Sequence, residues 1–246
     1  MNNKLTRRQM LIAGSGVLGG VFCTGCKLEL PPTYGTILQL GDALTYAAHR
    51  AILPEQALVK EFDRSQISPF PAINTTDPED ETYQRLKTTG FVDWRLLVDG
   101  LVKQPKAYSV ADLMNFPSRT QITQHQCEQG WTAIGEWTGV QLSRILTSAG
   151  ISPNARYVVS YAADGHWDSL DMFDALHPQT LLAYGMNGNV LPVPHGAPVR
   201  LRVERQLGYK SVKYVNRLTV TDNLANIKDG TGSGMTAYGG SWYAGI

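Results

Sequence analysis

The sequence predicts an α+β fold in which short helices accompany mixed and antiparallel sheets, and its composition favours this class. The 246 residues include 24 glycines and 13 prolines, more than a helical bundle carries, which indicates many turns between short strands. Hydrophobic residues make up 43% and charged residues 17%, which is typical of a globular domain rather than a disordered chain or a membrane bundle. The formal net charge of +1 gives no electrostatic reason to expect a nucleic-acid partner, so any anion site must arise from local charge.

Residues 1–26 are interpreted as an export leader. Arg7 and Arg8 precede an uncharged stretch, residues 9–26, that is too short and too rich in glycine to span a bilayer comfortably. The form Thr-Arg-Arg-Gln-Met-Leu resembles the twin-arginine signal, a route that carries folded proteins. We therefore expect a periplasmic or exported protein. An ordinary secretory signal with two chance arginines is the alternative.

Two of the three cysteines, Cys23 and Cys26, lie at the end of this leader. Thr24 and Gly25 before Cys26 partly resemble a lipoprotein cleavage box, so a lipidated Cys26 or an uncleaved leader would tether the chain to a membrane. A Cys-x-x-Cys redox or metal pair is the alternative, although it would lie on a leader rather than on a folded scaffold.

Residues 27–64 are expected to form a linker and a short helix. Apolar residues recur at helical spacing over residues 36–53, and Pro54 ends the pattern. We expect this short helix to pack on the body of the protein; its apolar positions are Ile37, Leu40, Leu44, Ala48, Ala51 and Ile52. Residues 65–90 are rich in proline and threonine and predict an extended, irregular segment.

The main domain is expected to span residues 65–226, with regular structure from about Phe91. Residues 94–98 and 101–102 predict two strands joined by a tight turn at Asp99-Gly100. Ser109 is placed to cap a short helix, with Asp112 three residues further on. The remaining expected elements are, in order, a strand at 120–125, a helix at 139–149 capped by Gly150, a strand from 155, a helix at 169–176, a hairpin at 180–191 turning at Asn187-Gly188, strands at 199–203 and 214–221, and a tail at 227–246 that is an ordered coil or a mobile end.

Cys127 is the lone cysteine of the expected domain and follows a predicted strand. A thiolate is a soft ligand suited to a redox-active transition metal, and Trp131 and Trp137 could shield such a site from water. A buried structural thiol, and a zinc or copper pair with His125, are alternatives. No nucleotide-binding glycine loop, zinc-protease or hydrolase motif appears in the sequence.

Residues 195–217 form a local basic stretch. They contain six lysines and arginines, and Glu204 is their only acid. Such an excess suits the binding of a phosphate or another anion, with Gly208 allowing close backbone approach and Ser211 offering a hydroxyl and an amide. A solvated strand face is the alternative, and we assign Arg202 and Arg217 to it.

Three sequence blocks closely resemble the molybdopterin-binding domain of the sulfite-oxidase family: HQCEQGW, EWTGVQL and HPQTLLAYGMNGNVLPVPHGAPVRLRVERQLGYKSVKYV. The resemblance covers residues 67–222 and is nearest to exported bacterial members, including methionine sulfoxide reductases. It implies a mononuclear molybdenum cofactor, molybdopterin, with Cys127 as the catalytic residue and the protein's ligand to the metal. It further implies cofactor-binding roles for Asn74, Cys127, His195, Arg200, Ser211, Val212 and Lys213.

The sequence also departs from that family's pattern. Gln129 replaces the family's usual acid, and an arginine common near Ala72 is missing. No haem-binding motif occurs, so a separate electron-transfer partner, a cytochrome or a membrane haem protein, is expected. The resemblance implies oxygen-atom transfer on a small-molecule substrate, preferably reduction of an S-oxide or N-oxide. Tyr161, Asp164, His166 and Trp167 are candidates to line the substrate side, or they form an ordinary polar turn. A non-catalytic exported module that keeps the fold is the alternative function.

Overall fold

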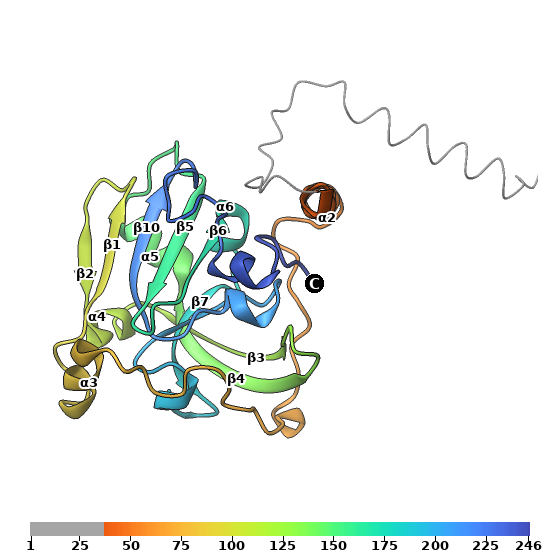
Figure 1. Cartoon of the computed structure of the whole chain (residues 1–246). Coiled ribbons are helices and arrows are strands. Elements are labelled where there is room, and N and C mark those ends of the chain that lie inside the picture. The colour runs from red at the N-terminus through yellow and green to blue at the C-terminus, as the bar shows by residue number, and fades with distance from the viewer. Residues whose placement is uncertain (1–36) are drawn as a thin grey trace, which may run out of the picture.

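The computed structural model describes residues 37–246, and side chains from Leu40 onward. The leader, most of the linker and the side chain of Ile37 lie outside the described residues. Residues 37–246 form two five-stranded sheets with short helices between and around them (Figure 1). The predicted α+β class, with mixed and antiparallel sheets, is therefore confirmed.

The first sheet has the order β2-β1-β10-β5-β6. Only β1 and β10 run parallel; the other neighbours are antiparallel. Its strands are β1 (Leu96–Gly100), β2 (Lys106–Tyr108), β5 (Tyr157–Ala162), β6 (Trp167–Asp171) and β10 (Val215–Thr221). The predicted turn at Asp99-Gly100 is wrong, because these residues continue β1 beside β10. Asp99 binds Arg217 and Thr219, and a Cβ on Gly100 would collide with the carbonyl of Val220.

The second sheet is antiparallel and is built around a long hairpin. Its strands are β3 (Ser118–Gln126), β4 (Thr132–Gln141), β7 (Leu181–Met186), β8 (Asn189–Val190) and β9 (Arg200–Arg202). The expected turn between β7 and β8 is confirmed: Asn187 and Gly188 both have positive φ, as a tight hairpin of this type requires. The hairpin of β3 and β4 places Cys127 in its connecting turn.

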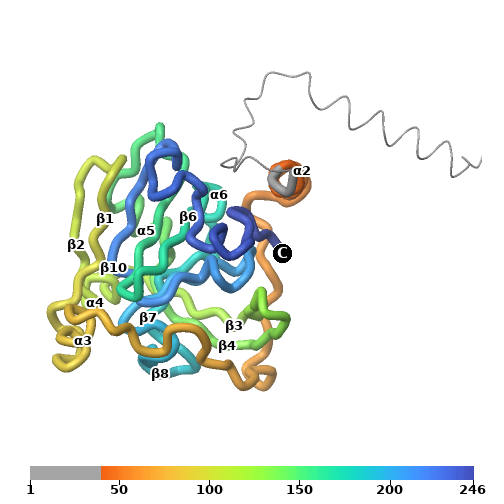
Figure 2. The backbone as a smooth tube through the Cα atoms, in the orientation of Figure 1, coloured from red at the N-terminus to blue at the C-terminus, as the bar shows by residue number. Residues whose placement is uncertain are grey.

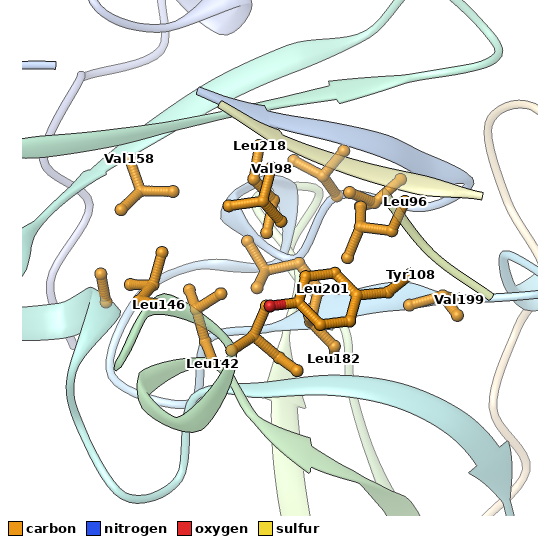
Figure 3. Packing of buried hydrophobic residues seen from close by; sticks show 14 of the residues in the cluster. Leu96, Val98, Tyr108, Leu142, Leu146, Val158, Leu182, Val199, Leu201 and Leu218 are labelled. Atoms are coloured by element: carbon orange, nitrogen blue, oxygen red, sulfur yellow. The ribbon is translucent and has the colours of Figure 1, made fainter. Parts of the chain in front are cut away.

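The main core lies between the sheets. Helix α5 (Leu142–Ala149) buries one apolar face there, and Gly150 ends it in the left-handed conformation as predicted. Figure 3 shows side chains of α5 meeting residues of both sheets, including Val98, Leu182 and Leu218. Each fully buried leucine or valine stabilises the fold by about 1.5–3 kcal/mol. Helix α4 (Val110–Met114) closes one end, and Ser109 and Asp112 form the predicted capping box.

Two predictions differ from the structure: the irregular segment at residues 65–90 and the helix at residues 169–176. Residues 65–90 contain a helix, α3 (Glu81–Thr88), which Asp80 caps and Tyr83 anchors in the core. Over residues 169–176, only α6 (Met172–Ala175) is helical, because residues 169–171 belong to β6. Every residue of β6 is buried, so this strand lacks the alternation that would have revealed it.

Both ends of the described chain meet on one side of the molecule (Figure 2). Helix α2 (Ile37–Ile52) lies beside the tail, and the extended segment that follows it passes the hairpin of β3 and β4 before reaching α3. The tail is ordered rather than mobile: Trp242 and Tyr243 are buried, and η5 (Gly234–Tyr238) forms a 3-10 turn. No helix within residues 37–246 is long and apolar enough to cross a membrane.

Candidate active site

A cavity of about 650 Å³ lies where the two sheets, the N-terminal segment and the tail converge. It is lined by residues 70–75, 125, 127–129, 131, 164–167, 194–195, 200, 208–209, 211–213, 234–235 and 237–238. All seven residues predicted to bind the cofactor belong to this lining. The structure thus brings together side chains from Asn74 to Lys213 that are far apart in the sequence.

Cys127 lies at the end of β3, in the turn that leads to β4. Its N–H donates to the carbonyl of Trp131 at 2.9 Å, and its own carbonyl accepts from Gly130 at 3.0 Å. The thiol is 7% exposed and donates weakly to Glu128 at 3.5 Å. Burial raises the pKa of the thiol, and the nearby Glu128 adds to the rise. The sulfur is therefore a protonated, rigidly held atom until a cation draws off its proton.

An aromatic cluster lies in and beside the lining of the same cavity. The ring of Phe70 meets Trp131, Trp137 and His195 edge-on, with centroids 5.4–5.9 Å apart. Trp131 lines the cavity as expected, whereas Trp137 is fully buried beneath it. Phe70 was missed by the sequence reasoning, because it belongs to a segment with no periodicity. Together these rings make the floor of the cavity apolar.

His125 is held as a neutral structural side chain. Its Nδ1 lies 2.9 Å from Nη1 of Arg202 and must accept, because a guanidinium only donates. Burial, reinforced by Arg202 and Arg200, lowers the pKa of His125 to about 2. No group of three metal-ligating side chains is found within residues 37–246, which leaves the zinc or copper alternative without support. Gly208 permits close approach as expected, but to the ring of His125, with which a Cβ would collide.

Arg200 is a buried cation that is only partly satisfied. Nη1 donates to the carbonyl of His195 at 3.1 Å and Nη2 to that of Ser211 at 2.9 Å, while Nε has no hydrogen-bond partner. No carboxylate among the described residues forms an ion pair with it. Burial and the neighbouring Arg202 lower the pKa of Arg200 to about 9. An anion in the cavity would give Arg200 a counter-charge and its Nε a hydrogen-bond acceptor.

Arg202 was assigned to a solvated strand face, and this assignment is wrong. Its guanidinium is buried and binds Glu204 through two hydrogen bonds of 3.0 and 2.7 Å. Arg217 fits that assignment, since its side chain is 49% exposed and pairs with Asp99.

Lys213 connects two walls of the cavity. Its Nζ donates to the carbonyls of Ile73 at 2.9 Å, Pro194 at 3.2 Å and Thr75. Burial and Arg200 lower the pKa of Lys213 to about 8. These bonds fix the segment that carries Asn74, whose φ of +60° turns the chain there. The lysine therefore contributes both a positive charge and the position of the opposite wall.

The turn of residues 211–213 offers backbone donors to the cavity. The Ser211 hydroxyl accepts from the N–H of Val203 at 3.0 Å and is thereby used in the fold. No hydrogen bond from the N–H of Val212 or Lys213 to another described residue is found. Both amides are consequently available to a ligand.

His195 ends the 3-10 turn η3 (Val193–His195) and faces the same space. Burial, Arg200 and Lys213 lower the pKa of His195 to about 4. The imidazole is therefore neutral at pH 7 and can either donate or accept a hydrogen bond.

A further wall, separate from the segment that carries Asn74, comes from residues 164–167 and the tail. Asp164, His166 and Trp167 line the cavity as expected, but Tyr161 does not; its ring instead faces Arg217 and Lys228. The tail residues Gly234, Met235, Ala237 and Tyr238 were missed as lining residues. Nothing in their glycine-rich sequence indicates that the tail folds back over this site.

This combination fits a molybdopterin cofactor. The thiol of Cys127, a soft ligand, shares the cavity lining with aromatic rings. Arg200, Lys213 and the N–H groups of Val212 and Lys213 provide positive charge and donors for an anionic group. The neutral His195 suits an uncharged heterocycle that carries its own donors and acceptors.

Comparisons with known proteins support the same assignment. Residues 84–226 match the family described as oxidoreductase molybdopterin binding domain. The chain is 33% identical, over 89% of its length and 83% of the relative, to an Azospira oryzae protein that carries the name protein-methionine-sulfoxide reductase subunit YedZ1. It is 34% identical, over 52% of its length and 44% of the relative, to the protein-methionine-sulfoxide reductase catalytic subunit MsrP of Ralstonia nicotianae.

A solved structure agrees with these matches. The sulfane dehydrogenase SoxCD of Paracoccus pantotrophus aligns with a TM-score of 0.51 and 30% identity, covering 54% of this chain and 39% of that one. The named relatives indicate an enzyme rather than the non-catalytic module kept as the alternative. Family match, relatives and cavity together establish that the chain belongs to the molybdopterin-binding oxidoreductases of the sulfite-oxidase family.

Proposed function

We propose that this chain reduces an S-oxide, with methionine sulfoxide as the leading substrate class, and receives electrons from a separate haem-carrying partner. The cavity carries the proposal, because its single thiol, Cys127, shares the lining with Arg200 and Lys213. The direction of the reaction follows from the two relatives named for methionine sulfoxide reduction. The expected N-oxide substrates belong to the same oxygen-transfer chemistry.

In this proposal each wall of the cavity has a role. Cys127 holds the metal, while Arg200, Lys213 and the amides of Val212 and Lys213 hold the anionic part of the cofactor. His195, Ser211 and Asn74 contact the remainder. When bound, the cofactor supplies two-electron oxygen-atom transfer.

Other residues control access to this chemistry. Phe70 and Trp131 exclude water from the sulfur, and the neutral His195 leaves the rim's positive charge to Arg200 and Lys213. His166 and Trp167 form the substrate side together with Met235 of the tail. The side chain of Met235 gives this wall an apolar, adaptable surface suited to a thioether-sized group.

A first experiment tests the metal and the direction together. The full chain, purified from a host that makes the cofactor, should contain about one molybdenum per chain and reduce methionine sulfoxide with a reduced viologen dye. Loss of a ligand should exceed the roughly 10–100-fold effects of outer-shell changes, so Cys127→Ser should lower turnover by more than about 100-fold.

Arg217→Gln is the matched control, because Arg217 belongs to the same basic stretch but lies outside the cavity lining. It should leave turnover unchanged. Activity with sulfite as the only substrate would refute the proposed direction, and a folded chain without molybdenum would refute the proposed chemistry.

Export and tethering complete the proposal. The pair Arg7-Arg8 supports passage through the twin-arginine route to the periplasm, with the leader or a lipidated Cys26 holding the chain at the membrane. Replacing both arginines with lysine should leave the protein in the cytoplasm. Unchanged export of that variant would point to the general secretory route.

A further inference from the structure

Helix α2 packs on the body as expected, but it exposes its apolar face. Leu40 is 61% exposed, Leu44 54% and Ile52 75%. Ala48 and Ala51 are exposed as well, so the pattern continues along the whole described helix. Spacing by three, four and seven places these five side chains on one side of a helix. We call them the α2 stripe.

The opposite face of α2 is fixed to the body by polar contacts and by the ring of Tyr46, which packs on Trp242 and Tyr243. Arg50 binds Asp171 at 2.8 Å and Asp174 at 2.7 Å, and Tyr46 donates to Asp171 at 2.7 Å. Arg50 and both carboxylates are largely buried. Asp42 accepts from Ser241 of the tail, further along the same face.

This network explains why the helix keeps its apolar face outward. Rotating α2 to bury the stripe would break the ion pairs of Arg50 and leave Asp171 and Asp174 buried without their cation. Separating such a pair costs about 3–5 kcal/mol. The arrangement is therefore the reverse of an ordinary surface helix, which packs its apolar face on the core.

A contiguous exposed apolar surface marks a contact with another apolar phase or partner. Three large side chains on one helix form a narrow surface, whereas a specific protein interface usually buries more than about 1,000 Å². A bilayer surface makes no such demand, since an interfacial helix need only insert its apolar side chains between headgroups. The stripe carries no charged residue, which suits the same environment.

The position of α2 in the chain favours the bilayer as well. Residues 9–26 of the leader are uncharged, and Leu40 follows Cys26 closely. An extended chain of that length reaches at most about 50 Å. A leader held in the membrane would therefore keep α2 near the bilayer surface, where even weak insertion is effective because a second attachment already exists.

We propose that the α2 stripe lies on the surface of a phospholipid bilayer and orients the domain against it. This rests on the proposed retention of the leader or a lipidated Cys26. The leader supplies attachment, and the stripe supplies orientation, because the polar face of α2 joins it rigidly to α6 and the tail.

The test reads the surroundings of the stripe directly. A photo-crosslinking amino acid replaces Ala48 in the full chain, which is bound to vesicles of phosphatidylcholine and phosphatidylglycerol. Illumination should attach phospholipid at this position, detected by mass. The same amino acid in place of Val190, which is 84% exposed and far from α2 in the sequence, should attach none.

Every other outcome overturns the proposal. Attachment to a second copy of the chain would make the stripe a dimer contact, and attachment to residues 1–36 would make it a seat for the leader. A chain that binds vesicles without attachment at residue 48 has its stripe in water. A chain that does not bind the vesicles has no bilayer contact at all.

A variant measures the contribution of the stripe. With the crosslinker at residue 48, the triple change Leu40→Glu, Leu44→Glu and Ile52→Glu should reduce lipid attachment at least about tenfold, since charged groups leave the apolar phase. The matched control is Val92→Glu, Met114→Glu and Val190→Glu, three exposed apolar side chains elsewhere on the surface. It should leave attachment unchanged.

Dye-linked turnover of methionine sulfoxide is measured on the same samples. It should be equal in the wild-type chain and both triple variants, because none of the six positions lines the cavity. Failure of this activity would contradict the proposed function without affecting the crosslinking result. Failure of crosslinking with intact activity would contradict only the bilayer contact.

Discussion

The basic stretch contains two kinds of cation, which differ in whether a carboxylate pairs with them. Arg202 and Lys210 each have a carboxylate partner: Arg202 binds Glu204 twice, and Lys210 lies beside Asp168 at 2.5 Å and the carbonyl of Trp242 at 2.6 Å. Arg200 and Lys213 face the cavity and donate only to backbone carbonyls. The first pair form ion pairs within the fold, and we propose that the second pair bind an anion.

Partners, rather than burial or residue type, make this distinction. Arg200 and Arg202 lie on the same short strand and are both buried, yet their pairing differs completely. Removing a charge from water without a counter-charge costs free energy, and the lowered pKa values of Arg200 and Lys213 reflect that cost. The difference therefore identifies the side chains whose counter-charge is expected to come from outside the protein.

The largest expected effect is a loss of folding stability when Arg202, the arginine paired with a carboxylate, is replaced. Arg202→Met leaves the Glu204 carboxylate buried without its cation and His125 without its donor. The free energy of unfolding should fall by about 3–5 kcal/mol, as measured by urea unfolding of the cofactor-free chain.

The double variant Arg202→Met with Glu204→Leu is the control. Removing both charges should recover much of that stability, because an apolar pair can replace a buried ion pair at little cost. No recovery would mean that Arg202 acts through packing on Trp137 rather than through its charge.

Replacing Arg200, which has no carboxylate partner, should have a smaller effect on stability and a distinct effect on cofactor binding. Arg200→Met removes an unpaired charge but leaves two carbonyls without donors, so the stability of the cofactor-free chain should change by only about 1–2 kcal/mol. Cofactor retention should suffer instead. Charge-assisted hydrogen bonds contribute about 1.5–3 kcal/mol each, so molybdopterin should be lost at least about tenfold faster on dialysis.

Pterin fluorescence of the retained fraction measures this loss. Equal retention by Arg200→Met and wild type would show that Arg200 serves the fold, and the comparison between the two arginines would fail.

The smallest expected effect is a pH dependence. In the cofactor-free protein the folded chain releases the Lys213 proton near pH 8, whereas an unfolded lysine keeps it to about pH 10.4. The unfolded state then binds more protons between these values, so the free energy of unfolding should rise with pH above about 8. Lys213→Met should flatten this rise over pH 8–9. An identical slope in the variant would assign the effect to another group.

Local signals predicted the parts of the fold that local chemistry determines. The capping box of Ser109 and Asp112, the left-handed Gly150 and the Asn187-Gly188 turn were all confirmed. The predicted turn at Asp99-Gly100 was wrong, because these residues instead contact the distant strand β10. Periodicity predicted the helix α2 but not the face that packs, because the distant carboxylates of Asp171 and Asp174 determine that face.

The candidate site shows the same division. Cys127 and the basic stretch were recognisable because their residue types are chemically distinctive and their motifs are continuous. Phe70 and the lining residues of the tail were missed, because their place in the lining depends on how separate segments fold back. The distinction between Arg200 and Arg202 also required the structure, since Glu204 is near both in the sequence, four residues from Arg200 and two from Arg202.

The parallel pairing of β1 with β10 has a consequence for how the protein folds. Asp99 and Thr219 meet across these strands although they are 120 residues apart, and β10 lies in the middle of its sheet. Contacts between such distant residues require a large loop to close before they stabilise anything, which slows folding. Strand β10 can join the first sheet only when this long loop closes, so we expect the domain to fold slowly and in one cooperative event. Lys213, two residues before β10, reaches its position only in that event, which makes a competent cofactor cavity a property of the completed fold.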